Sequence, residues 1–332
     1  MIPVGSLRRF RLAAAVGALS VPLAVSGCIV RIDSDGYRAR AEKRFPVSGP
    51  PEVKLTTFDG PIVVRGWERD EVFVEIEKRG RDAADVEAIE IEAEQRGDEV
   101  SVEARQPGGR TYAFGAVTTL SREAHLVASV PQQSRVMLRT GDGSISIERV
   151  TGRIELRTGD GSITGLDLRG EFLAHTDDGA IRVEGMDGRC DATTGDGSIT
   201  IHGRFDSLRA RTGDGPVVVK LLPGSMPTGD WDLATGDGAM VLYVPDGLSA
   251  DIDADASGKV ARVDHGLPFE GGADLPRGVL RGRFGAGGPT IRLRTGDGAI
   301  NLKRLPGQLP VPSASTDVES DFADKSEAGS PR

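Results

Sequence analysis

Carboxylates recur at one position of a repeated motif, and no other arrangement in the chain is better suited to chemistry. The motif reads Thr-x-Asp-Gly, followed by a small and an apolar residue. Its seven copies start at Thr140, Thr158, Thr176, Thr194, Thr212, Thr235 and Thr295. If successive copies stack as neighbouring strands, their aspartates lie about 4.8 Å apart, and like charges at that spacing favour a cation. The candidate calcium ligands are Asp142, Asp160, Asp178, Asp196 and Asp214.

The same turns also have a structural interpretation, which the sequence favours over calcium. Glycine tolerates the positive φ that many turns need, and Asp and Thr can hydrogen-bond the nearby backbone. Calcium-binding rolls of the RTX type need aspartate in both turns of the unit, whereas the alternate turns here read Val150-Thr151-Gly152 and Leu168-Arg169-Gly170. The neighbouring Arg139, Arg157 and Arg211 can also offset the negative charge. The turns are therefore expected to be structural corners, with calcium as the alternative.

A third interpretation of the turns is compatible with both of these. Exposed loops on repeat proteins often carry recognition, so the Asp-Gly edge is a candidate surface for a glycan, an envelope polymer or a protein.

The sequence argues against an enzyme. The aspartates repeat identically, whereas a catalytic acid and base need different environments to acquire different pKa values. The four histidines His125, His175, His202 and His265 lie at unrelated phases of the repeat, and no Gly-x-Ser-x-Gly elbow occurs. We therefore predict a non-enzymatic protein without a cofactor.

The elements that carry the motif follow from its period. The first five copies are 18 residues apart, and glycine recurs every nine residues from Gly143 to Gly224, with Asp206 in the single gap. A fixed period of this kind is the signature of a repeat architecture. The sequence predicts an all-β fold, a parallel β-solenoid with 18-residue coils, two strands and two turns per coil, and a less regular N-terminal β region.

Aligning the units produces four columns of mostly apolar residues. Along each strand the columns are two residues apart, the spacing of side chains that share one face. The first strand supplies Val136, Ile154, Phe172, Cys190, Leu208 and Ile291, and then Leu138, Leu156, Ala174, Ala192, Ala210, Leu233 and Leu293. The second strand supplies Ile145, Ile163, Ile181, Ile199, Val217, Met240 and Ile300, and then Ile147, Gly165, Val183, Ile201, Val219, Leu242 and Leu302. These columns are the expected interior, and Cys190 is expected there as a small hydrophobe.

The N-terminus predicts export and a lipid anchor. Arg8, Arg9 and Arg11 precede an apolar run that is too short to be a spanning helix, which is typical of a signal peptide. The run ends in Val25-Ser26-Gly27-Cys28, which resembles the bacterial lipobox and implies cleavage before a lipidated Cys28. The expected location is the bacterial cell envelope, with the outer membrane or an outer leaflet permitted. Cleavage removes three arginines and no acid, so the net charge moves from −9 to −12, which does not suggest nucleic-acid binding.

Composition and the repeat phase predict the organisation of the chain. We expect a signal peptide at 1–27, a polar spacer at 28–44, and an N-terminal β region at 45–130. A degenerate copy of the motif at Thr57 makes this region a candidate start of the solenoid. The solenoid repeats follow at 131–307, with an irregular insertion at 251–290. The tail at 308–332 is rich in Pro, Ser and acids and is expected to be disordered.

The chain resembles the bacterial "putative adhesin" family DUF4097/DUF4098, also called the toastrack domain. The matching pieces are Thr57–Trp67 with the acidic-valine strand that follows it, and the repeated Thr-Gly-Asp-Gly-Ser-Ile turns, over roughly residues 45–305. The resemblance implies a non-enzymatic envelope β-solenoid that sometimes accompanies envelope-stress systems, and it implies no catalytic residues. The expected function is structural or adhesin-like. The alternatives are a calcium-stabilised binding module and an accessory protein of an envelope-stress system.

Overall fold

The computed structural model describes residues 29–33, 36–106, 122–257, 259–263, 267–271 and 277–306. The predicted signal peptide, Cys28, His265 and the tail at 308–332 lie outside the described residues. Within them the fold is almost all β, with one short helix, α1 (Ala83–Glu87). No helix among these residues is long and apolar enough to cross a bilayer.

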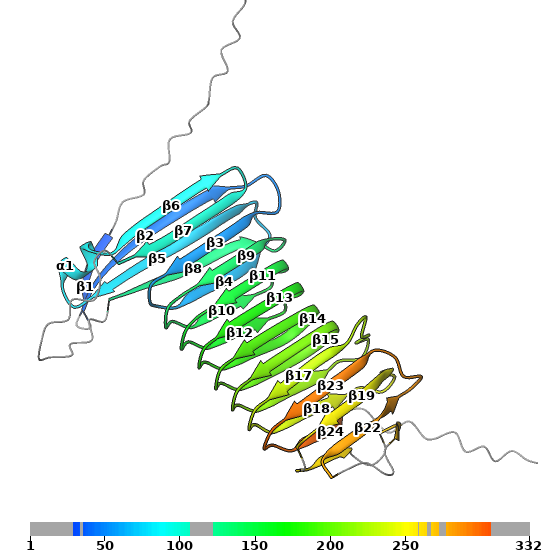
Figure 1. The fold of residues 1–332 in the computed structure, drawn as a ribbon. Coiled ribbons are helices and arrows are strands. Elements are labelled where there is room, and N and C mark those ends of the chain that lie inside the picture. Colours follow the sequence, from blue (N-terminus) through cyan, green and yellow to red (C-terminus); the bar gives the residue numbers. More distant parts are fainter. Residues whose placement is uncertain are drawn as a thin grey trace, which may run out of the picture.

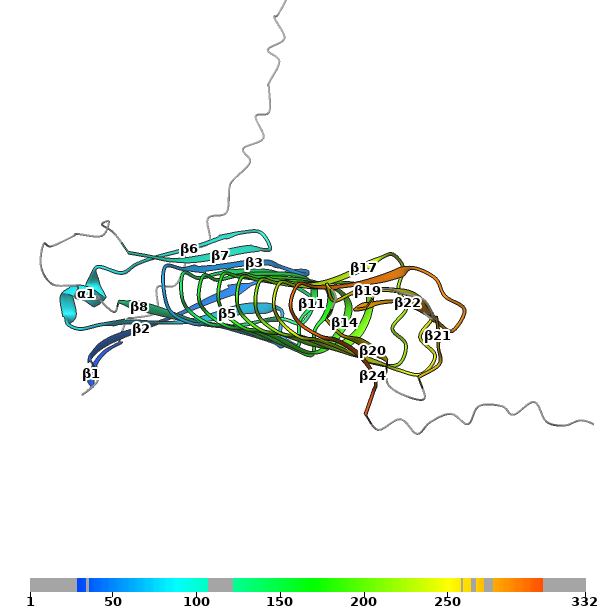
Figure 2. The same cartoon turned by 60° about the horizontal axis from the view of Figure 1, so that its bottom comes forward.

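The strands form two facing layers, which Figure 2 shows as the two long sides of flattened coils. In pairing order, layer one contains β6 (Glu90–Arg96), β7 (Glu99–Arg105), β3 (Glu52–Thr57), β9 (Arg135–Arg139), β11 (Thr151–Arg157), β13 (Arg169–Thr176), part of β14 (Ile181–Thr194), part of β15 (Ile199–Thr212), β17 (Trp231–Thr235), β23 (Thr290–Thr295), β19 (Ala250–Asp255), β22 (Val279–Phe284) and β21 (Phe269–Gly271). Layer two contains β1 (Ile29–Asp33), β2 (Gly36–Pro46), β5 (Glu71–Gly80), β8 (Glu123–Pro131), β4 (Ile62–Trp67), β10 (Ile145–Glu148), β12 (Ile163–Leu166), the remaining parts of β14 and β15, β16 (Val217–Leu221), β18 (Met240–Val244), β24 (Ile300–Arg304) and β20 (Ala261–Val263).

In the middle of the stack, each strand pairs in parallel with the strand 18 residues further along the chain. Ile145 is in register with Ile163, Ile163 with Ile181, and Ile181 with Ile199. Layer one keeps the same offset from Ile154 to Phe172 and Cys190. Equivalent residues of successive repeats therefore lie next to each other, and Figure 1 shows the resulting row of similar turns.

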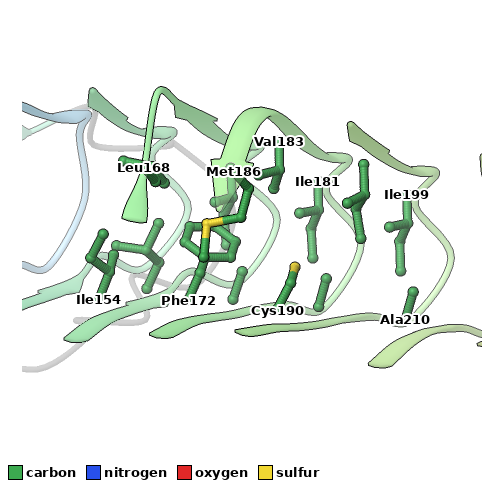
Figure 3. Close-up of a cluster of buried hydrophobic side chains, with 14 of the residues drawn as sticks. Ile154, Leu168, Phe172, Ile181, Val183, Met186, Cys190, Ile199 and Ala210 are labelled. Carbon is green, nitrogen blue, oxygen red and sulfur yellow. The ribbon is translucent and has the colours of Figure 1, made fainter. Parts of the chain in front are cut away.

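The interior between the layers contains the four predicted columns, all buried. Figure 3 shows Ile154, Phe172 and Cys190 facing Ile181, Val183 and Met186 across the interior. Gly165 occupies a column position where the other repeats have branched side chains. A side chain does not fit there, because a Cβ would lie 2.8 Å from Leu168 and 3.3 Å from the Phe172 ring. Phe172 thus occupies space that the opposite layer leaves free. Trp231, which the column alignment omitted, is in register with Ile291 and is fully buried.

At the N-terminal end the chain leaves the stack and returns to it. β3 and β4 pair with β9 and β10 on one side and with β7 and β8 on the other. Beyond them the pairing becomes antiparallel, through β6, β5, β2 and β1. Antiparallel strands that end a stack cover edges that would otherwise be open to another chain.

Two of the predicted segments differ from the structure. The prediction of a spacer at 28–44 is wrong for residues 29–33 and 36–44, which belong to β1 and β2; β2 pairs with β5 over nearly its whole length. Arg38, Arg40, Glu42 and Arg44 lie at every second position of β2, and the face between them includes the fully buried Phe45. The predicted insertion at 251–290 also contains strands, namely most of β19 and all of β20, β21 and β22. β23, which follows it, lies between β17 and β19. In the same way β24 lies between β18 and β20, so β23 and β24 are not the last strands of the two layers.

Candidate functional site

The threonine of the repeated motif is buried at the corner where layer one turns into layer two. All seven motif threonines are at most 8% exposed, and so is Thr57 in the degenerate copy. The Thr176 hydroxyl donates to the carbonyl oxygens of Gly159 (2.7 Å) and Gly161 (2.9 Å) in the preceding coil, and it accepts from the Gly179 N–H (3.1 Å). Each hydroxyl therefore joins its own turn to the preceding turn, which is a structural role.

The glycine of the motif is required by close approach of the coils. A Cβ at Gly179 would lie 2.0 Å from the carbonyl oxygen of Gly161, and the equivalent distances at Gly143, Gly161, Gly197, Gly215, Gly238 and Gly298 are 1.9 to 2.1 Å. None of these glycines has a φ in the left-handed region; the positive φ values fall in the alternate turns, at Gly152, Gly170 and Gly188. The expectation that the Asp-Gly corner needs glycine for its φ is therefore wrong.

The five candidate calcium ligands lie in one exposed column beside these corners. Asp142, Asp160, Asp178, Asp196 and Asp214 are each exposed, one per coil. The arginines that were expected to offset their charge pair elsewhere: Arg139 and Arg157 lie within 3.7 Å of Glu155, and Arg211 pairs with Asp232. Burial raises the pKa of Asp59, the first member of the column, and the neighbouring Asp142 raises it further. These three arginines therefore do not neutralise the five carboxylates.

Other groups that can do chemistry are dispersed over the described residues. His125 lies 2.7 Å from Glu123, His175 lies 3.3 Å from Asp177, and His202 is on layer two. Among these residues no group of three His, Cys, Asp or Glu side chains is placed to hold a metal ion. Burial raises the pKa of the Cys190 thiol, as expected of an inert core cysteine.

The outer surface of layer one carries ion pairs between adjacent strands. Most of its arginines lie beside carboxylates, as with Arg153 and Glu171 (2.5 Å), Arg209 and Asp191 (3.2 Å), and Arg292 and Asp230 (2.8 Å). Arg135, Arg139, Arg157, Arg211 and Arg294 are paired in the same way. Exposed pairs of this kind contribute little to stability, but they leave this surface electrically balanced.

The outer surface of layer two is different over its C-terminal half. The outward positions of β16, β18, β24 and β20 contain no carboxylate. We name six of their residues the basic patch: Val218, Lys220, Val241, Tyr243, Arg262 and Lys303. Sequence reasoning missed this patch because it followed the motif turns. The sequence did contain a sign of it, because one outward column of layer two changes from an acidic residue, Glu184, to basic residues further along the chain. The column contains Glu184, His202, Lys220, Tyr243 and Lys303.

Two shallow depressions lie at the alternate turns and share Gln132. One, of about 280 Å³, is lined by Trp67, Arg69 and Asp70 among others, and the other, of about 290 Å³, by Arg149, Asp167 and Arg169. Phe73 stacks on the Trp67 ring (6.4 Å between centroids), and the Arg69 guanidinium lies 4.9 Å from its centre. The ring is therefore already in contact with two neighbours and is poorly placed to stack on a ligand.

Comparisons with known proteins find similarity among solved structures. No family model and no curated protein matches the chain. A structure described as a putative cell adhesion protein from Clostridium sporogenes is 14% identical (TM-score 0.28), covering 80% of this chain and 98% of that one. A putative adhesin from Bacteroides fragilis is 11% identical (TM-score 0.35), covering 80% and 96%. A putative lipid binding protein from Parabacteroides distasonis is 12% identical (TM-score 0.40), covering 80% and 97%. At these scores the similarity carries no argument about the activity of this chain.

Proposed function

We propose that this chain is a lipid-anchored protein of the bacterial cell envelope, whose body is a parallel β-solenoid with a structural or adhesive, non-enzymatic role. One observation carries the proposal. The 18-residue register presents equivalent side chains on successive coils, so each outer surface is a row of repeated positions. A row suits an extended partner, which can be held at several positions at once.

The anchor and the fold are consistent with each other. The lipobox ends at Cys28, and β1 starts at the next residue, Ile29, so lipidation would hold the β1 end of the stack close to the bilayer. The far end, with β20 and β21, would then point away from the membrane (Figure 2). Such an arrangement presents both outer surfaces to the envelope.

Metabolic labelling tests the anchor. Cells that produce the full chain are grown with radioactive palmitate, and the protein is captured with an antibody. The proposal predicts label on the native chain and none on the Cys28→Ala variant. Cys190→Ala is the matched control, since it removes the other cysteine of the chain and should leave the label unchanged. Equal label on native protein and the Cys28→Ala variant would contradict a lipid on Cys28.

The second proposal is a calcium-stabilised form of the same stack. It is favoured by the exposed aspartate column, whose charges are not offset by Arg139, Arg157 or Arg211, because those arginines pair with other carboxylates. Asp142, Asp160, Asp178, Asp196 and Asp214 would then share Ca²⁺ between adjacent coils. A role as an accessory protein of an envelope-stress system is a third proposal, which only the family resemblance supports.

A further inference from the structure

We infer that the basic patch on layer two binds an anionic polysaccharide, an inference that rests on the proposed envelope function. The patch lies on four consecutive strands, β16, β18, β24 and β20. Lys220 is in register with Tyr243, and Tyr243 with Lys303. In the neighbouring column Val218 is in register with Val241, and Arg262 flanks Asn301 on the terminal strand.

The charges of the patch are available to a partner. Lys220, Lys303 and Arg262 make no ion pair with any residue in the described ranges. Eight arginines of layer one, by contrast, lie beside carboxylates of their own sheet. In a chain of net charge −9, cations gathered without acids form a local surface of the opposite sign. Such a surface attracts an anionic partner and repels a cationic one.

The position of Lys220 is partly set before binding. Its ammonium nitrogen lies 5.7 Å from the centre of the Tyr243 ring, a distance at which the ring attracts the cation. Adjacent strands are about 4.8 Å apart, so Lys220 and Lys303, on either side of Tyr243, are about 10 Å apart along the stack. Carboxylate groups that recur along a polymer chain can meet both lysines, and the Tyr243 hydroxyl can hydrogen-bond a sugar hydroxyl between them.

The shape of the patch favours a polymer over a bilayer. Val218 and Val241 are half-buried, so the surface beside its cations is partly apolar. A protein that lies on a membrane inserts large apolar side chains into the interface. The large hydrophobic residues exposed in the described ranges are Leu166 and Met226, and neither belongs to the patch. The aspartate edge borders layer two at the motif turns, so an anionic chain would follow the lysine column, away from that edge.

The test measures binding of the purified full chain, in nonionic detergent, to immobilised polygalacturonate. Neutral dextran and immobilised glycerophosphoglycerol, the water-soluble head group of phosphatidylglycerol, serve as the comparison ligands, because detergent would dissolve lipid vesicles. We expect binding to polygalacturonate that weakens as salt is raised, because exposed charges are screened. The Lys220→Gln/Lys303→Gln variant should bind about tenfold more weakly, the loss expected for two exposed ion pairs. The matched control is Arg169→Gln/Arg189→Gln, which removes two exposed cations outside the patch and should bind as the native chain does.

Three outcomes would overturn the inference: equal loss in both double variants, equal binding to dextran, or preference for the lipid head group, which would make the patch a membrane contact. Circular dichroism melts of each variant show whether a loss reflects unfolding. If Lys220→Gln/Lys303→Gln melts early, the single variant Lys303→Gln, at a half-exposed site with no ion pair, gives the same comparison. If the chain sediments with crude envelope but does not bind polygalacturonate, the inference about the basic patch is refuted and the proposed function is not. Absence of binding to envelope would instead refute the proposed function.

Discussion

Replacing Thr176 by valine tests whether the motif threonine joins adjacent coils. Valine keeps the shape and removes the hydroxyl, which is fully buried and bonds to the carbonyl oxygens of Gly159 and Gly161 and to the Gly179 N–H. A buried polar group that loses its partner costs about 1–3 kcal/mol. For a chain of this size that corresponds to a fall in Tm of about 2–12 °C, at about 2–4 °C per kcal/mol.

The assay combines thermal unfolding, followed by circular dichroism, with hydrogen exchange. Stacked repeats can open locally, so we also expect faster exchange in the peptides around residues 159–181. Thr164→Val is the matched control, because Thr164 is exposed on β12 and its hydroxyl makes no hydrogen bond to another of the described residues. Its effect should stay within about 0.5 kcal/mol. A Thr176→Val variant that melts and exchanges like Thr164→Val would refute the assigned role of the hydroxyl.

Further predictions concern the corner glycine, acid stability and calcium. Gly179→Ala should destabilise the chain by about 1–3 kcal/mol or more because its Cβ would meet backbone, whereas Gly229→Ala, with nothing within 4 Å, should be neutral in urea unfolding. A hydrogen bond from Arg81 helps lower the pKa of Asp85 from 3.8 to about 2. The ionised form is thus favoured in the folded state, and its contribution to stability is lost as the pH falls from about 4 to about 2. An Asp85→Asn variant should melt at a Tm that changes less over that range. The calcium proposal predicts a lower Tm with chelator than with Ca²⁺, and an unchanged Tm would contradict it.

Much of the central stack could be predicted from the sequence because its side chains obey a strict period. The same offset sets the register of Ile145, Ile163 and Ile181 and buries the motif threonines. Alternation along each strand then separates the interior from the outer surfaces. The 18-residue period of the sequence is the same as the offset between paired strands, so the register of the central strands follows directly from the sequence.

The ends of the stack could not be predicted from the repeat, because there the pairing is between segments far apart in sequence. β2 pairs with β5 and has no motif turn, so its charges suggested a spacer. Trp231 was missed because the loop before β17 shifts the phase by five residues, from 18 to 23 between Thr212 and Thr235. The helix α1 is only five residues long, too short for a helical stripe, and its start depends on the Asp82 cap and the buried Asp85.

The candidate site was only partly predictable. The aspartates form an exposed column, as the repeat predicted. The glycine that follows each aspartate is needed because successive coils pack closely there, and not because the backbone has a positive φ. The basic patch depends on which cations have carboxylate neighbours, and that requires the pairing of β16, β18 and β24. Sequence alone shows the lysines without showing that they are adjacent.

The most direct test of the account is sedimentation of the purified full chain, in nonionic detergent, with delipidated envelope polymers from its own source. Detergent and delipidation remove the contribution of the lipid anchor, so retention reports on the protein surface. The account predicts that the chain pellets with the polymer and is released by salt. A chain that stays in the supernatant at low salt, while its circular dichroism spectrum shows it folded, would contradict the proposed adhesive role.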